Sequence, residues 1–198
     1  MFDARPSQAQ AEPEPLRSAY LHGMHFPPHR LRPIAANDGP ALFALIDRNR
    51  SRLEDFFAGT VAVTRTLADT EQHVQNMLAR AEARTYYAFA LVHQDTDELV
   101  GFVDIKNIDW NIPKAELGAF MDAAHEGKGL ASQALAAITR HGFEELGFDK
   151  LLIRTHHGNT GARRVIEKNG YELEGIVRKD YRTTAGVVVD LMYYGKVR

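Results

Sequence analysis

A chain of 198 residues, 44% of them hydrophobic and 25% charged, is long enough to bury one core and too short for two comfortable domains. The formal net charge of −2 gives no general attraction to nucleic acid, and the absence of cysteine excludes disulfides, thiolate metal sites and a cysteine nucleophile. No apolar run reaches membrane-spanning length and the first residues lack the hydrophobic core of a signal peptide, so we expect a cytoplasmic protein without a membrane partner.

The first 20 residues are expected to lie outside the folded domain. Residues 1–20 are rich in Ala, Gln, Glu and Pro and contain few large apolar side chains, which predicts a flexible arm. The remaining residues, 21–198, are expected to form a single domain. This domain opens at His29–Ile34, whose alternating pattern, with a proline near its end, is typical of a short edge strand.

Two helices should follow this strand. The segment 37–40 supplies a capping residue and a first-turn proline, and apolar residues recur after it at helical spacing. A second helix is predicted to begin near Asp69, where a capping pair occurs, and to end by Arg84. Phe56 and Phe57 lie between the two helices, and we expect both to belong to the core.

Strand patterns dominate the middle of the chain. Residues 86–93, 99–108 and 115–121 are apolar and are separated by polar breaks, which predicts three consecutive antiparallel strands. A helix over 130–146 and a strand over 151–155 then imply a right-handed parallel crossover. The sheet is therefore expected to be mixed.

The C-terminal part adds one helix and one hairpin. The helix is expected over 163–169, with Gly170 as its C-terminal capping residue, and the hairpin strands over 171–182 and 187–194. The order of elements predicts an α/β (α+β) fold with a mixed, largely antiparallel sheet of about six to seven strands, flanked by about four helices.

A glycine-rich loop connects the strand 115–121 to the following helix. Gly127 and Gly129 let the backbone turn its N–H groups toward one point, and the first helical turn adds unpaired donors and the positive end of its dipole. Such a loop is suited to a phosphate-bearing ligand. A Walker A motif is excluded, because Asp122 and Gly129 occupy its glycine and Ser/Thr positions, and Ser132 leaves the dinucleotide fingerprint incomplete.

The loop and three further segments match one known family. Glu126–Ala131 fits the pattern of Gln or Arg, two residues, Gly, one residue, then Gly or Ala, except at its first residue. The other segments are Ala115–Gly118, Asn159 and the stretch Glu167–Gly175. From about His29 to its C-terminus the chain resembles the GNAT superfamily of acetyl-CoA-dependent N-acetyltransferases, particularly the Rim-type ribosomal-protein N-terminal acetyltransferases. The resemblance implies the GNAT fold, splayed between the fourth and fifth strands.

The resemblance also implies where acetyl-CoA binds. Its pantetheine arm would pair with the backbone near the end of the strand 115–121, and its diphosphate would lie on the glycine loop. The implied cofactor-binding residues are Phe120, Met121, Glu126, Gly127, Lys128, Gly129, Leu130, Ala131, Ser132, Asn159 and Arg164. Three of them have ordinary structural alternatives, because Lys128 and Arg164 suit a solvated surface and Asn159 suits a helix N-cap. Glu126 would repel a diphosphate unless it pointed outward.

The implied reaction is direct attack of a primary amine on the thioester, with no metal. Glu116 matches the position of a general base, although a carboxylate at the start of a strand is also a common edge charge. The family's usual proton donors are missing, because Ile166 and Ala162 occupy the tyrosine and serine positions. Tyr171, Tyr194 and His156 remain as candidate proton donors, although the two tyrosines match aromatic core positions of the family pattern. His156 and His157, adjacent on an extended chain, point to opposite faces, and no third ligand has a suitable spacing, so the pattern does not favour a zinc site.

The sequence therefore predicts transfer of an acetyl group from acetyl-CoA to a primary amine within a ternary complex. The acceptor would be a protein N-terminal amine or a small-molecule amine, with no direct nucleic-acid partner, and the protein would be a monomer or a homodimer. The resemblance also offers an alternative to a core position for Phe56 and Phe57, because the same region often lines the acceptor pocket in this family. A non-catalytic acyl-CoA-binding or sensing module is the alternative, motivated by Glu126, Ile166 and Ala162.

Overall fold

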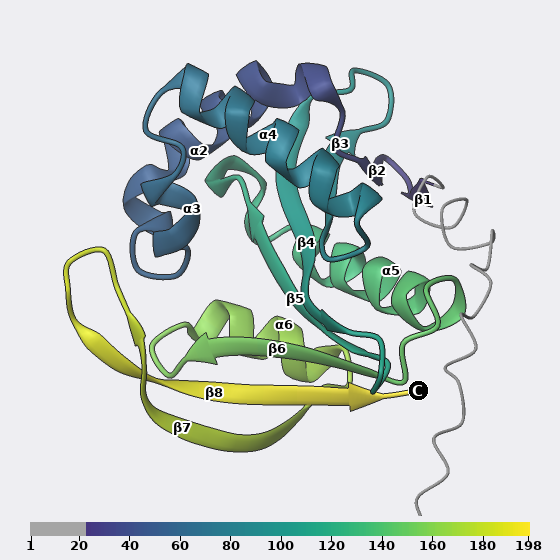
Figure 1. Cartoon of the computed structure of the whole chain (residues 1–198), viewed down its shortest axis with the longest axis vertical. Coiled ribbons are helices and arrows are strands. Elements are labelled where there is room, and N and C mark those ends of the chain that lie inside the picture. The colour runs from purple at the N-terminus through teal and green to yellow at the C-terminus, as the bar shows by residue number, and fades with distance from the viewer. Residues whose placement is uncertain (1–22) are drawn as a thin grey trace, which may run out of the picture.

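The computed structural model describes residues 23–198, which form one eight-stranded sheet with helices on both faces (Figure 1). The arm expected over 1–20 lies outside the described residues. The strands are β1 (Met24–Phe26), β2 (His29–Pro33), β3 (Tyr87–His93), β4 (Leu99–Asp109), β5 (Lys114–Met121), β6 (Lys150–His156), β7 (Glu172–Arg182) and β8 (Val188–Val197). The helices are α2 (Gly39–Leu53), α3 (Ala58–Ala62), α4 (Leu67–Glu82), α5 (Leu130–Glu144) and α6 (Thr160–Lys168), with short 3₁₀ turns η1 (Ala36–Asp38) and η2 (Ala123–His125).

The sheet has the order β1-β2-β3-β4-β5-β6-β8-β7. Only β5 and β6 are parallel neighbours, because α5 carries the chain back across the sheet between them, whereas the other pairs are antiparallel. The predicted mixed and largely antiparallel sheet is confirmed. It has one strand more than expected, because Met24–Phe26 pairs with the start of β2, and α3 is a short additional helix between α2 and α4.

Two apolar layers hold helices against opposite faces of the sheet. Buried residues of α2 and α4 pack on one face with Ala90 and Val92 of β3, whereas α5 and α6 pack on the other face with Phe89 and Leu91. Successive residues of a strand point to opposite faces, so β3 is buried on both sides and its sequence is continuously apolar. The central strands are thereby held rigidly between two helical layers.

The parallel pairing of β5 and β6 is short. It comprises three residue pairs and ends at Glu116 and Leu152. Beyond this point β5 pairs only with β4, through Met121, and β6 pairs only with β8, through His156. The two strands therefore diverge and open the sheet toward α3 (Figure 1), at the position where the splay was expected.

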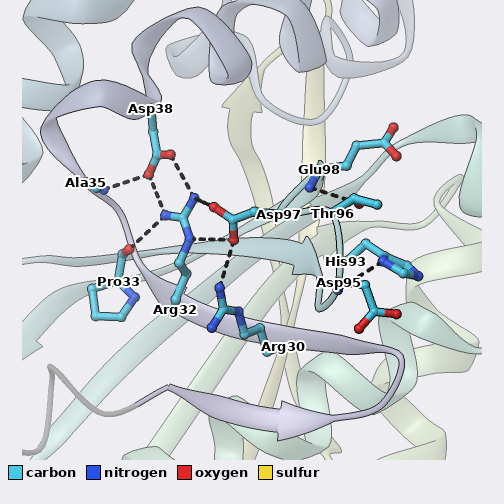
Figure 2. A network of polar contacts seen from close by, with 10 residues as sticks. All are labelled: Arg30, Arg32, Pro33, Ala35, Asp38, His93, Asp95, Thr96, Asp97 and Glu98. Carbon is cyan, nitrogen blue, oxygen red and sulfur yellow. Dashed lines mark hydrogen bonds and ion pairs between the residues drawn. The ribbon is translucent and has the colours of Figure 1, made fainter.

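A closed group of ion pairs fixes the opposite edge of the sheet (Figure 2). We call Arg32, Asp38 and Asp97 the rim network. The Arg32 guanidinium donates to both oxygens of Asp38, at 2.7 and 2.9 Å, and to Asp97 at 3.1 and 3.3 Å. Asp38 also accepts from the backbone N–H of Ala35 at 2.7 Å, and Arg30 adds a 2.9 Å bond to Asp97. The hydrogen bond to Asp38 raises the pKa of Arg32, and the network ties β2 and η1 to the β3–β4 turn.

Candidate active site

The space between the diverging strands is a cleft. Its walls come from β4, β5, β6, α6 and the β7–β8 hairpin, and the loop between α2 and α3 closes it on one side. Glu116, Gly118 and Arg154 line it, together with Asn159 and His156 at the end nearest α6. The cleft therefore collects polar side chains at the end of the β5–β6 pairing.

Glu116 is 7% exposed and occupies the last paired position of β5. Its Oε2 accepts a 2.8 Å hydrogen bond from Asn107 and lies 2.9 Å from Arg154 Nε. Its Oε1 lies 3.9 Å from the ammonium of Lys106, the residue directly opposite on β4. Two cations and an amide thus hold this carboxylate at the narrow end of the cleft.

The charges continue on both sides of Glu116. Lys106 also lies 3.5 Å from Asp104, and Arg154 lies 3.6 Å from Asp180 on β7. We call Asp104, Lys106, Glu116, Arg154 and Asp180 the cleft network. Within the described residues, Asp104 Oδ1 is buried without a hydrogen-bond partner. A buried polar atom without a partner is rare in folded proteins, and this one lies beside Lys106, which lines the cleft.

Gly118 leaves room for the charged side chains of Asp104 and Lys106 beside the cleft. A Cβ at this position would lie 2.3 Å from Asp104 Oδ1 and 2.7 Å from Lys106 Nζ. No larger residue fits without moving these charges, which explains a glycine within an otherwise apolar strand.

The loop after α2 forms the roof of the cleft. Phe56 stacks on His156 with ring centroids 4.6 Å apart, and Phe57 meets Phe120 edge to face at 5.3 Å. The hairpin holds this loop, since Tyr181 accepts from the N–H of Ala58 at 2.8 Å. Both phenylalanines line the cleft, which is the alternative that the family resemblance offered. Only Phe57 also packs against the α2–α4 core, so the expectation of a core position is wrong for Phe56.

Thr184 reinforces the roof from the turn between β7 and β8. Its backbone N–H and its hydroxyl both donate to the carbonyl of Glu54, at 3.1 and 2.7 Å. The hairpin and the end of α2 are therefore joined across the mouth of the cleft.

His156 is the titratable ring in the roof. Burial lowers its pKa, Asp55 opposes this effect and His157 adds to it, so the environment favours the neutral ring. Its Nδ1 accepts from the N–H of Gly158 at 3.1 Å, which leaves the proton of the neutral ring on Nε2. His157 is exposed, and no three His, Asp or Glu residues among 23–198 are arranged to hold a metal ion.

The other candidate proton donors do not line the cleft. Tyr171 is buried against Thr139, with the two hydroxyl oxygens 2.7 Å apart, and burial raises its pKa to about 12. Tyr194 donates to Glu167 at 3.0 Å from within the core. Ile166 and Ala162 do line the cleft, and neither carries a hydroxyl group.

The glycine loop has the backbone conformation that was expected. Gly127 and Gly129 have φ values of +73° and +77°, and a Cβ on either would meet nothing within 4 Å. Gly129 is the N-cap of α5, and its carbonyl accepts from the N–H groups of Ser132 and Gln133 at 3.1 Å. Within the described residues, the N–H groups from Gly127 to Ala131 have no hydrogen-bond partner. They form an open cradle of donors.

The remaining predicted cofactor residues divide into two groups. At the loop, the carboxylate of Glu126 forms an ion pair with Arg52 of α2, and Lys128 Nζ donates to the carbonyl of Ala124 at 3.1 Å. The hydroxyl of Ser132 accepts from Asn169 at 3.0 Å, and Leu130 is buried.

Near the cleft, Asn159 Oδ1 accepts from the N–H of Ala162 at 3.2 Å, which makes it the N-cap of α6 while it lines the cleft. Phe120 and Met121 lie on the part of β5 beyond its pairing with β6. Arg164 is exposed and does not line the cleft.

Sequence reasoning missed the partners of Glu116. Asp104 and Lys106 are two residues apart within an otherwise apolar strand, and Arg154 interrupts another. Charges at alternate positions of apolar strands must share one face, and that signal was present. Their proximity depends on the register of three strands.

Comparisons with known proteins identify the family to which the chain is similar. The sequence model of the acetyltransferase (GNAT) domain matches residues 29–172. The chain is 28% identical over 153 residues to the probable N-acetyltransferase YjcK of Bacillus subtilis (strain 168), covering 77% of this chain and 84% of that protein. It is 28% identical over 149 residues to the ribosomal-protein-serine acetyltransferase of Escherichia coli (strain K12), covering 75% and 82%.

A solved structure has the same fold. RimL, described as a ribosomal L7/L12 alpha-N-protein acetyltransferase in complex with coenzyme A, superimposes with a TM-score of 0.81 at 21% identity, covering 89% of this chain and 98% of that one. At this identity the similarity concerns the fold. No helix among residues 23–198 is both long and apolar enough to cross a membrane.

Proposed function

Because the chain belongs to the GNAT family of acetyltransferases, we propose that it transfers an acetyl group from acetyl-CoA to a primary amine in the cleft between β5 and β6. The observation that carries this proposal is that the free edge of β5 leads directly to the glycine loop. Beyond Glu116, the last residue paired with β6, the edge of β5 is free as far as Met121, and the open cradle of N–H groups begins six residues later at Gly127. An extended ligand with a diphosphate at one end fits this path.

The residues present suit acetyl-CoA. The N–H groups from Gly127 to Ala131 would receive the diphosphate, and the free edge of β5 near Phe120 and Met121 would pair with the amides of the pantetheine arm. The open space above Gly127 and Gly129 leaves room for close approach. Asn159 has an amide at the same end of the cleft, so capping of α6 and cofactor contact are compatible.

When bound, acetyl-CoA supplies a thioester carbonyl that an amine can attack. Glu116 would accept the amine's proton, directly or through a water, and Arg154 and Lys106 hold the carboxylate in position for this role. His156, neutral and with its proton on Nε2, would donate a hydrogen bond toward the reacting groups from the roof. Phe56 shields that ring from water by stacking on it.

The acceptor would be a protein N-terminal amine, with a small-molecule amine as the second choice. The similarity to ribosomal-protein acetyltransferases supports this order. The mouth of the cleft also supports it, because it lies between the α2–α3 loop and a long exposed hairpin that a polypeptide could contact. We propose that the protein works in the cytoplasm, as a monomer or homodimer.

A mass-resolved acetylation assay over a panel of peptides and small amines tests the proposal. Acetyl-CoA is the donor, and calorimetry with CoA is run in parallel. We expect acetylation of the α-amine of at least one peptide and no transfer to the same peptide with a blocked N-terminus. Binding of CoA without transfer to any acceptor would favour the acyl-CoA-binding or sensing module instead.

A further inference from the structure

The ion pair between Arg52 and Glu126 lies at the first residue of the glycine loop. Arg52 belongs to the last turn of α2, and Glu126 directly precedes Gly127. Their side chains are 44% and 59% exposed. An exposed ion pair is weak in water, and a stronger anion can replace its carboxylate partner.

The backbone of α2 is fixed relative to this loop independently of that pair. Arg48 Nε lies 2.6 Å from Asp122 Oδ2, and the amide of Asn49 donates to the same carboxylate at 3.2 Å. The amide oxygen of Asn49 accepts from the N–H of Ala123 at 2.9 Å and from Arg52 at 3.2 Å. The guanidinium of Arg52 is therefore held near η2, whichever anion it contacts.

The charges favour an exchange of partners. A diphosphate on the N–H groups after Gly127 would lie close to the carboxylate of Glu126 and be repelled by it. The two phosphates carry more negative charge than one carboxylate, and the planar fork of a guanidinium matches phosphate oxygens. The other nearby cation, Lys128, is bonded to the carbonyl of Ala124.

We infer that Arg52 is a cofactor-binding residue that pairs with Glu126 in the free protein and moves to the diphosphate of CoA when the cofactor binds. The resembled pattern has Gln or Arg at the position of Glu126, whereas here a positive charge comes from Arg52 of α2. This inference rests on the proposed function, since it requires that the glycine loop receive CoA.

Calorimetric titration with CoA of four proteins tests the exchange: the wild type, Arg52→Gln, Glu126→Gln and the double variant. Arg52→Gln should weaken CoA binding about tenfold, the value of one charged hydrogen bond. Glu126→Gln should strengthen binding severalfold, because it removes both the competing partner and the repulsion. The double variant should remain about tenfold weaker than Glu126→Gln alone.

A different result in the double variant would overturn the inference. If Arg52 only neutralised Glu126, the loss caused by Arg52→Gln would disappear once Glu126 was replaced. Dephospho-CoA retains the diphosphate and lacks the 3′-phosphate, so the effect of Arg52→Gln should persist with it. Loss of the effect with this ligand would also contradict the assignment.

Arg50→Gln is the matched control. Arg50 lies on the same helix and pairs with Asp47, away from the loop, so its replacement should leave CoA affinity unchanged. A wild-type protein that bound no CoA would defeat the proposed function itself. Binding by the wild type combined with full rescue in the double variant would defeat only the exchange.

Discussion

Two ion-pair networks join strands of the same sheet, and they differ in how completely their polar atoms are bonded. In the rim network every guanidinium nitrogen of Arg32 donates a hydrogen bond, and both oxygens of Asp38 accept one. In the cleft network Asp104 Oδ1 is buried without a hydrogen-bond partner in the described part of the chain, and Lys106 lies 3.5 and 3.9 Å from its two carboxylate partners.

The difference has a physical meaning. Buried polar groups are normally bonded within the protein, and a completed network serves chain folding. Charged groups left partly bonded cost stability, and they are retained where a ligand can use them. We therefore expect changes in the rim network to affect stability and changes in the cleft network to affect catalysis.

The largest expected effect is on turnover, from Glu116→Gln. The substitution keeps the shape of the side chain and removes its basicity, so turnover should fall about hundredfold while CoA affinity is unchanged. Thiol release measures the rate and calorimetry measures the affinity. Glu174→Gln is the control, because Glu174 is an exposed partner of Lys150 outside the cleft. Normal turnover in Glu116→Gln would contradict a catalytic role for the cleft network.

Asp38→Asn should produce the opposite outcome. Asp38 is 5% exposed, and its replacement leaves the Arg32 guanidinium and the N–H of Ala35 with weaker acceptors. We expect a loss of about 2 kcal/mol in the free energy of unfolding and a fall of about 6 °C in Tm, with turnover unaffected at 25 °C. Thermal unfolding followed by circular dichroism measures this. A variant with normal stability and reduced turnover would contradict the claim that the rim network serves stability alone.

Gly129→Ala separates ligand binding from backbone strain. Gly129 has a φ of +77°, so alanine should cost about 1 kcal/mol of stability and should weaken CoA binding about tenfold by displacing the N–H cradle. Gly147 has a φ of +74° and equally open surroundings. Gly147→Ala should show the same thermal destabilisation with normal CoA affinity. Equal losses of affinity in both variants would mean that the loop acts only through stability.

The smallest effect concerns acid stability. A hydrogen bond from Arg32 lowers the pKa of Asp97 in the folded protein. A carboxyl group with a depressed pKa contributes stability above its unfolded pKa of about 3.9, and this contribution disappears as the pH falls through the folded value. The difference in Tm between the wild type and Asp97→Asn should therefore shrink between about pH 5 and pH 2. A difference in Tm that stayed constant over this pH range would contradict the effect of Arg32 on Asp97.

The elements that alternation and helical spacing mark clearly were predictable. The strands from β2 to β8, the helices α2, α4, α5 and α6 and the parallel crossover follow from patterns within each segment. The short elements β1 and α3 were not. The strand β1 has three residues and exists through its pairing with β2, and α3 has five residues with no periodicity to detect.

The candidate site also has one part that was predictable from the sequence and one part that was not. The amino-acid sequence determined the glycine loop, because the left-handed conformations of Gly127 and Gly129 are properties of those residues and their immediate neighbours. Only the tertiary structure decided the surroundings of Glu116. Lys106 lies opposite it through the β4–β5 register, and Arg154 reaches it from two residues beyond Leu152 through the β5–β6 register. Register is set by the packing of whole strands against two helical layers. It therefore cannot be derived from Lys106, Glu116 and Arg154 alone.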